Sequence, residues 1–282
     1  MRFLVTGAGG QLGGDLLGVL PAAVGLTRTQ LSVADRDAVA EAVAGFDVVL
    51  NCAADNAVDA AETAPERAFG VNVEGAGNVA WACRQAGVRL VHFSTNFVFD
   101  GSGSRPFTEE DAPRPLGAYG RSKLEGERLV LELMPAALIV RSSGLFGSRG
   151  SAVKGGSFPE RILRRVEAGE TVRVVDDQLL NPTYTADLAA GVAALVRRGE
   201  QGVVHLVAEG CCSYWEMAVE TMRLAGYSAA VEPTSSAALG AAAARPANGC
   251  LASVRVTALR HWREGLAAWW RAWSALEAVR RP

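Results

Sequence analysis

The chain opens with Arg2-Phe-Leu-Val-Thr6, a short apolar stretch that is followed at once by Gly7-Ala-Gly-Gly-Gln-Leu-Gly13. The apolar stretch is typical of a buried strand, and the residues after the glycines predict an amphipathic helix. Gly7, Gly10 and Gly13 have the spacing of a dinucleotide-binding turn. In such a turn the first glycine permits a tight bend, the second lets the backbone approach a pyrophosphate, and the third packs helix on strand. The helix N-terminus then faces the phosphates.

The alternation of strand and helix continues along the chain. We expect strands at 23–27, 47–51, 89–93, 137–141, 171–175 and 203–207, and helices at 35–44, 57–62, 64–86, 158–168, 185–198, 213–225 and 260–280. Strands separated by helices predict an α/β fold with a Rossmann-type doubly wound parallel sheet. The less regular later part predicts a smaller α/β C-terminal lobe for the substrate.

This pattern gives a division of the chain. We expect residues 1–147 to form the dinucleotide-binding domain, with 171–207 returning to it, and residues 148–170 and 208–282 to form the substrate-binding lobe. The Gly- and Ser-rich segment Ser148–Ser157 predicts a mobile loop that could close over a substrate. In the last helix, large apolar residues recur at helical spacing and indicate packing: Trp262, Leu266, Trp269 or Trp270, Trp273 and Leu276.

Composition excludes several classes of function. The 282 residues are 49% hydrophobic and 21% charged, with a net charge of −2, which offers no basic field for a nucleic acid. The first apolar stretch is too short for a signal segment and no later one reaches spanning length, so we expect a cytoplasmic protein without a membrane partner. Five cysteines and three histidines lack metal-ligand spacing, so no metal is expected and the cysteines are interpreted as small core or structural residues.

The segment Leu116–Glu127 places Tyr119 and Lys123 four residues apart at the start of a predicted helix, so the two share one face. A neighbouring ammonium favours a phenolate, and we therefore expect Lys123 to lower the pKa of Tyr119. Such a pair can hand a proton to a carbonyl oxygen. Taken alone, the spacing also fits a solvated lysine beside a half-buried tyrosine.

Polar residues follow the predicted strand 89–93. Ser94, Thr95 and Asn96 stand at its C-terminal end, which is where an open α/β sheet binds its ligand. A β-branched residue such as Thr95 is also what strand propensity alone would place there.

These residues together resemble the dTDP-4-dehydrorhamnose reductase family of the extended short-chain dehydrogenase/reductase superfamily. The resemblance covers nearly the whole chain and is carried by residues 5–13, 57–59, Glu62, 71–72, 94–101, 115–127, 174–178, 182–183, 187–188 and 245–246. It implies an NAD(P)H-dependent reductase of the C4 ketone of a dTDP-linked 4-keto-6-deoxysugar. By the same resemblance Thr95, Tyr119 and Lys123 form the catalytic set, with Thr95 polarising the ketone, Tyr119 as general acid, and Lys123 also bonding the nicotinamide ribose.

The remaining expected site residues fall into two groups. The cofactor-binding residues are expected to be Gly7, Gly10, Gln11, Leu12, Gly13, Thr27, Arg28, Ser32, Val33, Ala53, Ala54, Asn56, Phe93, Tyr119 and Lys123. The substrate-binding residues are expected to be Thr95, Asn96, Gly144 and Arg245.

Three positions depart from the family pattern. Asn96 stands where the family usually has Asp, Asn56 where it usually has Thr, and Gly144 where the rhamnose enzyme has a Trp against the sugar. Loss of an indole wall predicts a larger pocket at Gly144. Ketone reduction is therefore implied, whereas strict 4-dehydrorhamnose specificity is not.

The end of the predicted strand 23–27 bears on the cofactor. An NAD-preferring site has an acid near this point, which repels a 2′-phosphate. Here Thr27 takes that place and Arg28, which follows, can make bidentate hydrogen bonds to phosphate. We expect NADPH as the cofactor, with NADH as the alternative.

A second functional class stays open at the level of sequence. The regulatory β chain of methionine adenosyltransferase resembles the same family, so a non-catalytic cofactor-binding subunit is the alternative. Retention of Thr95, Tyr119 and Lys123 favours the enzyme. The expected partner is a nucleotide-sugar substrate, with a homodimer as the assembly to consider.

Overall fold

The computed structural model describes residues 1–147, 155–228 and 231–280. Most of the predicted loop Ser148–Ser157 therefore lies outside the described residues.

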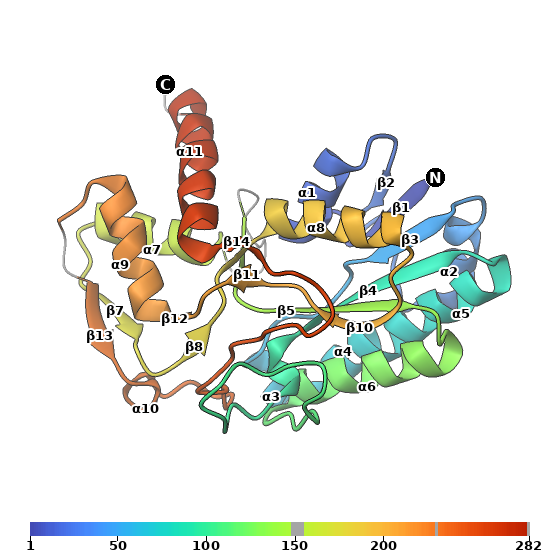
Figure 1. Cartoon of the computed structure of the whole chain (residues 1–282), viewed down its shortest axis with the longest axis horizontal. Helices are drawn as coiled ribbons and strands as arrows, with labels where there is room; N and C mark the ends of the chain where they lie inside the picture. Colours follow the sequence, from blue (N-terminus) through green and yellow to red (C-terminus); the bar gives the residue numbers. More distant parts are fainter. Residues whose placement is uncertain (148–154, 229–230, 281–282) are drawn as a thin grey trace.

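A six-stranded sheet forms the centre of the larger of two lobes (Figure 1). Its strand order is β10-β5-β4-β3-β1-β2, and every neighbouring pair is parallel. The strands are β1 (Phe3–Thr6), β2 (Val24–Leu26), β3 (Val48–Asn51), β4 (Arg89–Thr95), β5 (Leu138–Ser142) and β10 (Gly202–His205). The predicted doubly wound fold is confirmed.

Helices cover both faces of this sheet (Figure 1). On one face lie α1 (Gln11–Val19) and α8 (Thr185–Arg198), which share a core with Val5, Leu50 and Val140. On the other lie α2 (Arg36–Val43), α5 (Ala76–Ala86) and α6 (Ala118–Leu133), packed on Leu4, Val49 and Ile139. Successive strand residues thus enter opposite cores, as the period of two requires.

The predicted helical stretch before α5 is divided into short pieces. These are α3 (Ala60–Thr63), α4 (Pro65–Phe69) and a π-helical turn, η1 (Gly70–Gly75), which runs directly into α5. A π-turn widens the backbone locally and often marks a functional position. Here it presents Asn72 toward the end of the sheet where the predicted site lies.

The C-terminal lobe joins several two-stranded sheets to helices. β7 (Val172–Val175) pairs with β13 (Val231–Thr234), β8 (Leu179–Leu180) with β12 (Cys212–Ser213), β6 (Leu145–Phe146) with β9 (Thr183–Tyr184), and β11 (Ala208–Glu209) with β14 (Leu259–His261). The helices are α7 (Phe158–Glu167), α9 (Tyr214–Ala225), α10 (Ser236–Leu239) and α11 (Trp262–Arg280). Within 171–207, β10 belongs to the six-stranded sheet and α8 packs on it. β7, in contrast, pairs with β13 in the C-terminal lobe.

The tryptophan-rich face of α11 is the core of this lobe. Trp262, Trp269 and Trp273 are buried with Leu266, as the helical spacing predicts. The indole nitrogen of Trp269 donates to the carbonyl of Gly147. Leu276, in contrast, is 45% exposed, so the buried stripe ends before it.

Four of the five cysteines lie in a hydrophobic core or form a disulfide. Cys83 and Cys212 are buried in the two cores. Cys211 and Cys250 form a disulfide, a pairing that the sequence does not predict. Among the described residues, no group of three His, Cys, Asp or Glu side chains could hold a metal ion, and no helix is long and apolar enough to cross a membrane.

A buried ion pair fixes α6 to the sheet. The guanidinium of Arg141, on β5, donates from Nε and Nη2 to the two carboxylate oxygens of Glu127, on α6, at 2.9 and 2.6 Å. Both side chains are almost fully buried. Since each charge depends on the other for compensation, loss of one partner leaves an uncompensated buried charge.

We therefore predict that Glu127→Ala destabilises the protein by about 3–5 kcal/mol, because Arg141 is left buried without its carboxylate. Urea unfolding followed by circular dichroism measures this change. Glu125→Ala is the matched control, since Glu125 pairs with Arg128 on the exposed side of the same helix, where a pair contributes about 1 kcal/mol or less. Equal stabilities for the two variants would contradict the assignment.

Candidate active site

The glycine-rich turn meets the end of β3. Gly7 has φ of +63°, and a Cβ built on it would lie 2.7 Å from the amide nitrogen of Ala53. A Cβ on Gly13 would lie 2.6 Å from the carbonyl oxygen of Gly7. Only glycine fits at these two positions, as the predicted roles in turn and packing require.

The start of α1 is open to an anion. Its N-cap is Gly10, which has no side chain to accept from the first amide groups of the helix. Gln11 carries a buried side-chain oxygen with no hydrogen-bond partner among the described residues, and Leu12 is packed in the core. Free amides at a helix N-terminus fit the pyrophosphate of a dinucleotide, so the described residues suit the expected cofactor.

The residues expected around the adenosine end lie after β2. Thr27 donates from its hydroxyl and its amide to the side-chain oxygen of Gln30, at 2.8 and 3.0 Å, which fixes the turn. Arg28 and Ser32 are exposed within this segment. Val33 is buried against Gly75, so its side chain belongs to the core beneath α5. Asn56 and Ala54 are exposed after β3.

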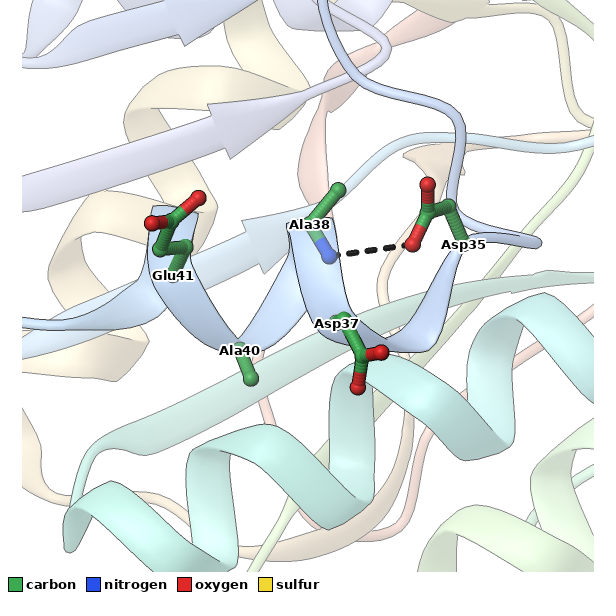
Figure 2. A pocket seen from close by; sticks show the side chains of 5 residues that line it. All are labelled: Asp35, Asp37, Ala38, Ala40 and Glu41. Carbon is green, nitrogen blue, oxygen red and sulfur yellow. Dashed lines mark hydrogen bonds between the residues drawn. The ribbon is translucent and has the colours of Figure 1, made fainter.

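An acidic hollow lies on the outer surface of α2 (Figure 2). It is lined by Asp35, Asp37, Ala38, Ala40 and Glu41, and Asp35 caps the helix by accepting from the amide of Ala38 at 3.0 Å. Its carboxylates would repel phosphates, and none of its residues belongs to the predicted site. We do not assign the cofactor to this hollow.

The predicted catalytic residues meet where β4 ends. Tyr119 stands in the first turn of α6, and the side chain of Thr95, the last residue of β4, lies near enough to influence its pKa. Lys123, one turn further along α6, is buried and donates from Nζ to the carbonyl oxygen of Phe93 at 2.7 Å. The ring of Phe97 packs edge-on against Tyr119, with centroids 5.5 Å apart. The structure thus brings all three side chains to one end of the sheet.

Burial decides the protonation of Tyr119 and Lys123. It raises the pKa of Tyr119 to about 12, against the lowering effect of the nearby Thr95 side chain, while the carboxylate of Asp55 acts in the same direction as burial. The expected net lowering of this pKa is wrong for this structure, because burial outweighs the interactions that favour the phenolate. The neutral phenol is nonetheless the form that can donate a proton to a reduced ketone.

Burial also lowers the pKa of Lys123 to about 8, and the nearby Glu127 carboxylate and Cys52 oppose that shift. Lys123 is therefore mostly protonated at neutral pH. Its positive charge can stabilise the phenolate that Tyr119 becomes after giving up its proton.

Asn72 was not among the predicted site residues, yet it holds the site together. Its side-chain amide donates to the carbonyl of Asp55 and to Ser122 Oγ, both at 2.9 Å, and its side-chain oxygen accepts from the Asp55 amide at 2.9 Å. Ser122 donates in turn to the carbonyl of Tyr119 at 2.8 Å. The signal in the sequence was an asparagine within an apolar, buried helical stretch, where an amide needs such partners.

Two of the expected substrate residues, Asn96 and Arg245, bond to other residues of the chain. Asn96 is buried, accepts from Thr95 and donates to the carbonyl of Gly249 at 3.0 Å. Arg245 forms a bidentate ion pair with Asp59, at 3.0 and 2.7 Å.

Gly144 carries a constraint that the sequence does not show. Its φ is +58°, and a Cβ there would lie 2.6 Å from the Leu180 side chain and 2.7 Å from the carbonyl oxygen of Asn181. A tryptophan at this position would need both a strained backbone and displaced neighbours. Substitution at Gly144 is therefore not a clean test of pocket size, and its place in the pocket wall stays a prediction.

Comparison with known proteins assigns the chain to a family. The family described as RmlD substrate binding domain matches residues 1–274. The chain belongs to this family. It is 42% identical to a dTDP-4-dehydrorhamnose reductase of Streptomyces griseus, with 94% of the chain and 91% of the relative covered. It is 38% identical to a dTDP-4-keto-6-deoxy-D-glucose reductase of Streptomyces niveus, with 94% and 95% covered.

A solved structure supports the same assignment to the RmlD family. The dTDP-4-dehydrorhamnose reductase of Bacillus anthracis, in complex with NADP, superimposes with a TM-score of 0.92 at 32% identity. The match covers 96% of this chain and 99% of that one. The protein is thus an oxidoreductase of the dTDP-4-dehydrorhamnose reductase type.

The pKa of Lys123 gives a testable pH dependence. We predict that kcat/KM for ketone reduction falls as the pH rises through about 8, because Lys123 then loses the charge that stabilises the Tyr119 phenolate, while Tyr119 itself stays protonated. Initial rates from pH 6 to 10, with cofactor affinity measured in parallel, test this. A flat profile between pH 7 and 10 would contradict it.

Proposed function

We propose that this protein uses NADPH to reduce the C4 ketone of a dTDP-linked 4-keto-6-deoxysugar. The observation that carries the proposal is the convergence of Thr95, Tyr119 and Lys123 at the end of β4, beside a glycine turn shaped for a dinucleotide. The names of the relatives, which are reductases of such sugars, support the substrate class. They also favour the enzyme over the non-catalytic subunit.

The chemistry divides between the cofactor and the chain. Bound NADPH supplies the hydride, and its pyrophosphate would be held at the start of α1. Tyr119 donates its proton to the oxygen of the ketone as that oxygen gains negative charge. Thr95, whose side chain lies near Tyr119, supports the same oxygen, and the ammonium of Lys123 stabilises the resulting phenolate. The hydrogen bond to Phe93 keeps that ammonium in place.

Two arginines lie near the buried phenol of Tyr214, and one of them, Arg245, is already paired with Asp59. Arg161 and Arg245 both act on Tyr214, where their positive charges favour the phenolate, although burial dominates and raises the pKa of that tyrosine. Guanidinium groups bind phosphates through charge-assisted hydrogen bonds. Arg161 was not among the residues predicted from sequence.

The names of the relatives bear on which 4-keto sugar the protein reduces. The two relatives compared above are named for different sugars, 4-dehydrorhamnose and 4-keto-6-deoxy-D-glucose. Both classes of 4-keto sugar should be tested as substrates, because Gly144 and Asn96 depart from the pattern of the rhamnose enzyme. The cytoplasmic location and the homodimer remain predictions.

We predict that Tyr119→Phe lowers kcat by about 100-fold or more and leaves NADPH affinity nearly unchanged, because the ring stays while the proton donor is lost. Loss of reduced-nicotinamide absorbance with dTDP-4-keto sugars measures turnover, and ligand titration measures affinity. Turnover of the variant at the rate of the unmodified protein would reject the mechanism.

A separate prediction concerns the choice of cofactor. Arg28→Ala is expected to lower the ratio of kcat/KM for NADPH over NADH by about 10-fold, because a charge-assisted contact with the 2′-phosphate is lost. Arg198→Ala, at the exposed end of α8, is the control and should leave the ratio unchanged. A protein that prefers NADH, or an Arg28 variant with the same ratio, would remove this assignment.

A further inference from the structure

The helix that carries Tyr119 begins without a cap of its own. α6 starts at Ala118, and its N-cap, Gly117, has no side chain to accept from the first amide groups. Tyr119 lies within this first turn, so any movement of the turn moves the phenol. The position of the proton donor therefore depends on what holds the start of α6.

A carboxylate from a different helix supplies the missing cap. Glu62, on α3, accepts from the amide of Ala118 through Oε1 at 2.7 Å. Gly117 makes this approach possible, because a Cβ at that position would collide with the same oxygen. A carboxylate at a helix N-terminus also interacts favourably with the helix dipole.

The stretch that carries Glu62 is tied to the C-terminal lobe. Asp59, at the start of α3, pairs with the guanidinium of Arg245 and accepts from the amide of Ala243 at 3.1 Å. Ala61, between the two acids, is buried with Ala118 and packs against Tyr119. Residues 59–62 therefore contact the C-terminal lobe at one end and the catalytic helix at the other.

We propose that Glu62 is a positioning residue for Tyr119, and that the Asp59–Arg245 ion pair holds the short helix on which Glu62 stands. Seating of the C-terminal lobe then sets the position of the proton donor. This inference rests on the proposed function, since it assigns Glu62 a role in the proton transfer by Tyr119. Glu62 acts through the backbone of α6 and takes no proton itself.

A misplaced catalytic group costs turnover more than binding. We expect Glu62→Ala to lower kcat by about 10-fold or more with little change in KM for either substrate, because the first turn of α6 loses its acceptor. Glu62→Gln keeps an acceptor oxygen of the same reach and is expected to recover most of kcat. Glu62→Asp keeps the charge but shortens the reach, so its kcat is expected between those of the other two.

The same measurements on neighbouring acids complete the design. Glu66→Ala, on the exposed face of α4, is the matched control and should leave kcat unchanged. Asp59→Ala should lower kcat in the same direction as Glu62→Ala, and the double variant should lose less than the two single losses combined, because both act through one contact. Thermal unfolding and NADPH titration of every variant separate a shift of Tyr119 from a loss of folding.

The outcomes distinguish this inference from the proposed function. If Tyr119→Phe is inactive while Glu62→Ala and Glu62→Asp turn over like the unmodified protein, Glu62 does not position Tyr119. The same conclusion holds if Glu62→Gln is as slow as Glu62→Ala, or if kcat falls only in proportion to the folded fraction. If Tyr119→Phe itself keeps full turnover, the proposed function fails first.

Discussion

The buried ion pair between Glu127 and Arg141 is the constraint on which the site depends. It fixes the middle of α6 to β5, and both side chains lie where an unpaired charge would be costly. One turn before Glu127, Lys123 is bonded to the carbonyl of Phe93 on β4. A helix held at these two points can present Tyr119 to the end of the sheet with little freedom.

Burial gives this arrangement its chemistry. The surroundings that keep Tyr119 protonated also bring the pKa of Lys123 close to neutral pH, with Glu127 opposing the shift. Glu127, which anchors α6 to β5, therefore also favours the protonated form of Lys123 through its negative charge. Asn72 adds a second link, since its amide joins the loop after β3 to Ser122 on the same helix.

The sequence predicts the elements whose signal is local. The predicted roles of Gly7 and Gly13 in the turn agree with the structure, which leaves no room for a Cβ at either position. Most strand and helix bounds agree within two residues, because periodicity and glycines define them. It fails where the cause is tertiary. The Cys211–Cys250 disulfide, the ion pair of Arg245 with Asp59 and the left-handed backbone of Gly144 join or adjoin segments far apart in the chain. The predicted lowering of the Tyr119 pKa was wrong for the same reason, since helical spacing shows a nearby lysine but not the burial that raises this pKa.

In the proposed reaction, a hydride reaches C4 of a dTDP-linked sugar while Tyr119 supplies the proton. The most direct measurement is turnover of a dTDP-4-keto-6-deoxysugar with NADPH deuterated at nicotinamide C4, followed by NMR and mass analysis of the sugar. Hydride transfer to C4 predicts one deuterium, located at C4 of the product and carried on carbon. Deuterium at another carbon, or a product with none when every transferable position of the cofactor is labelled, would contradict it.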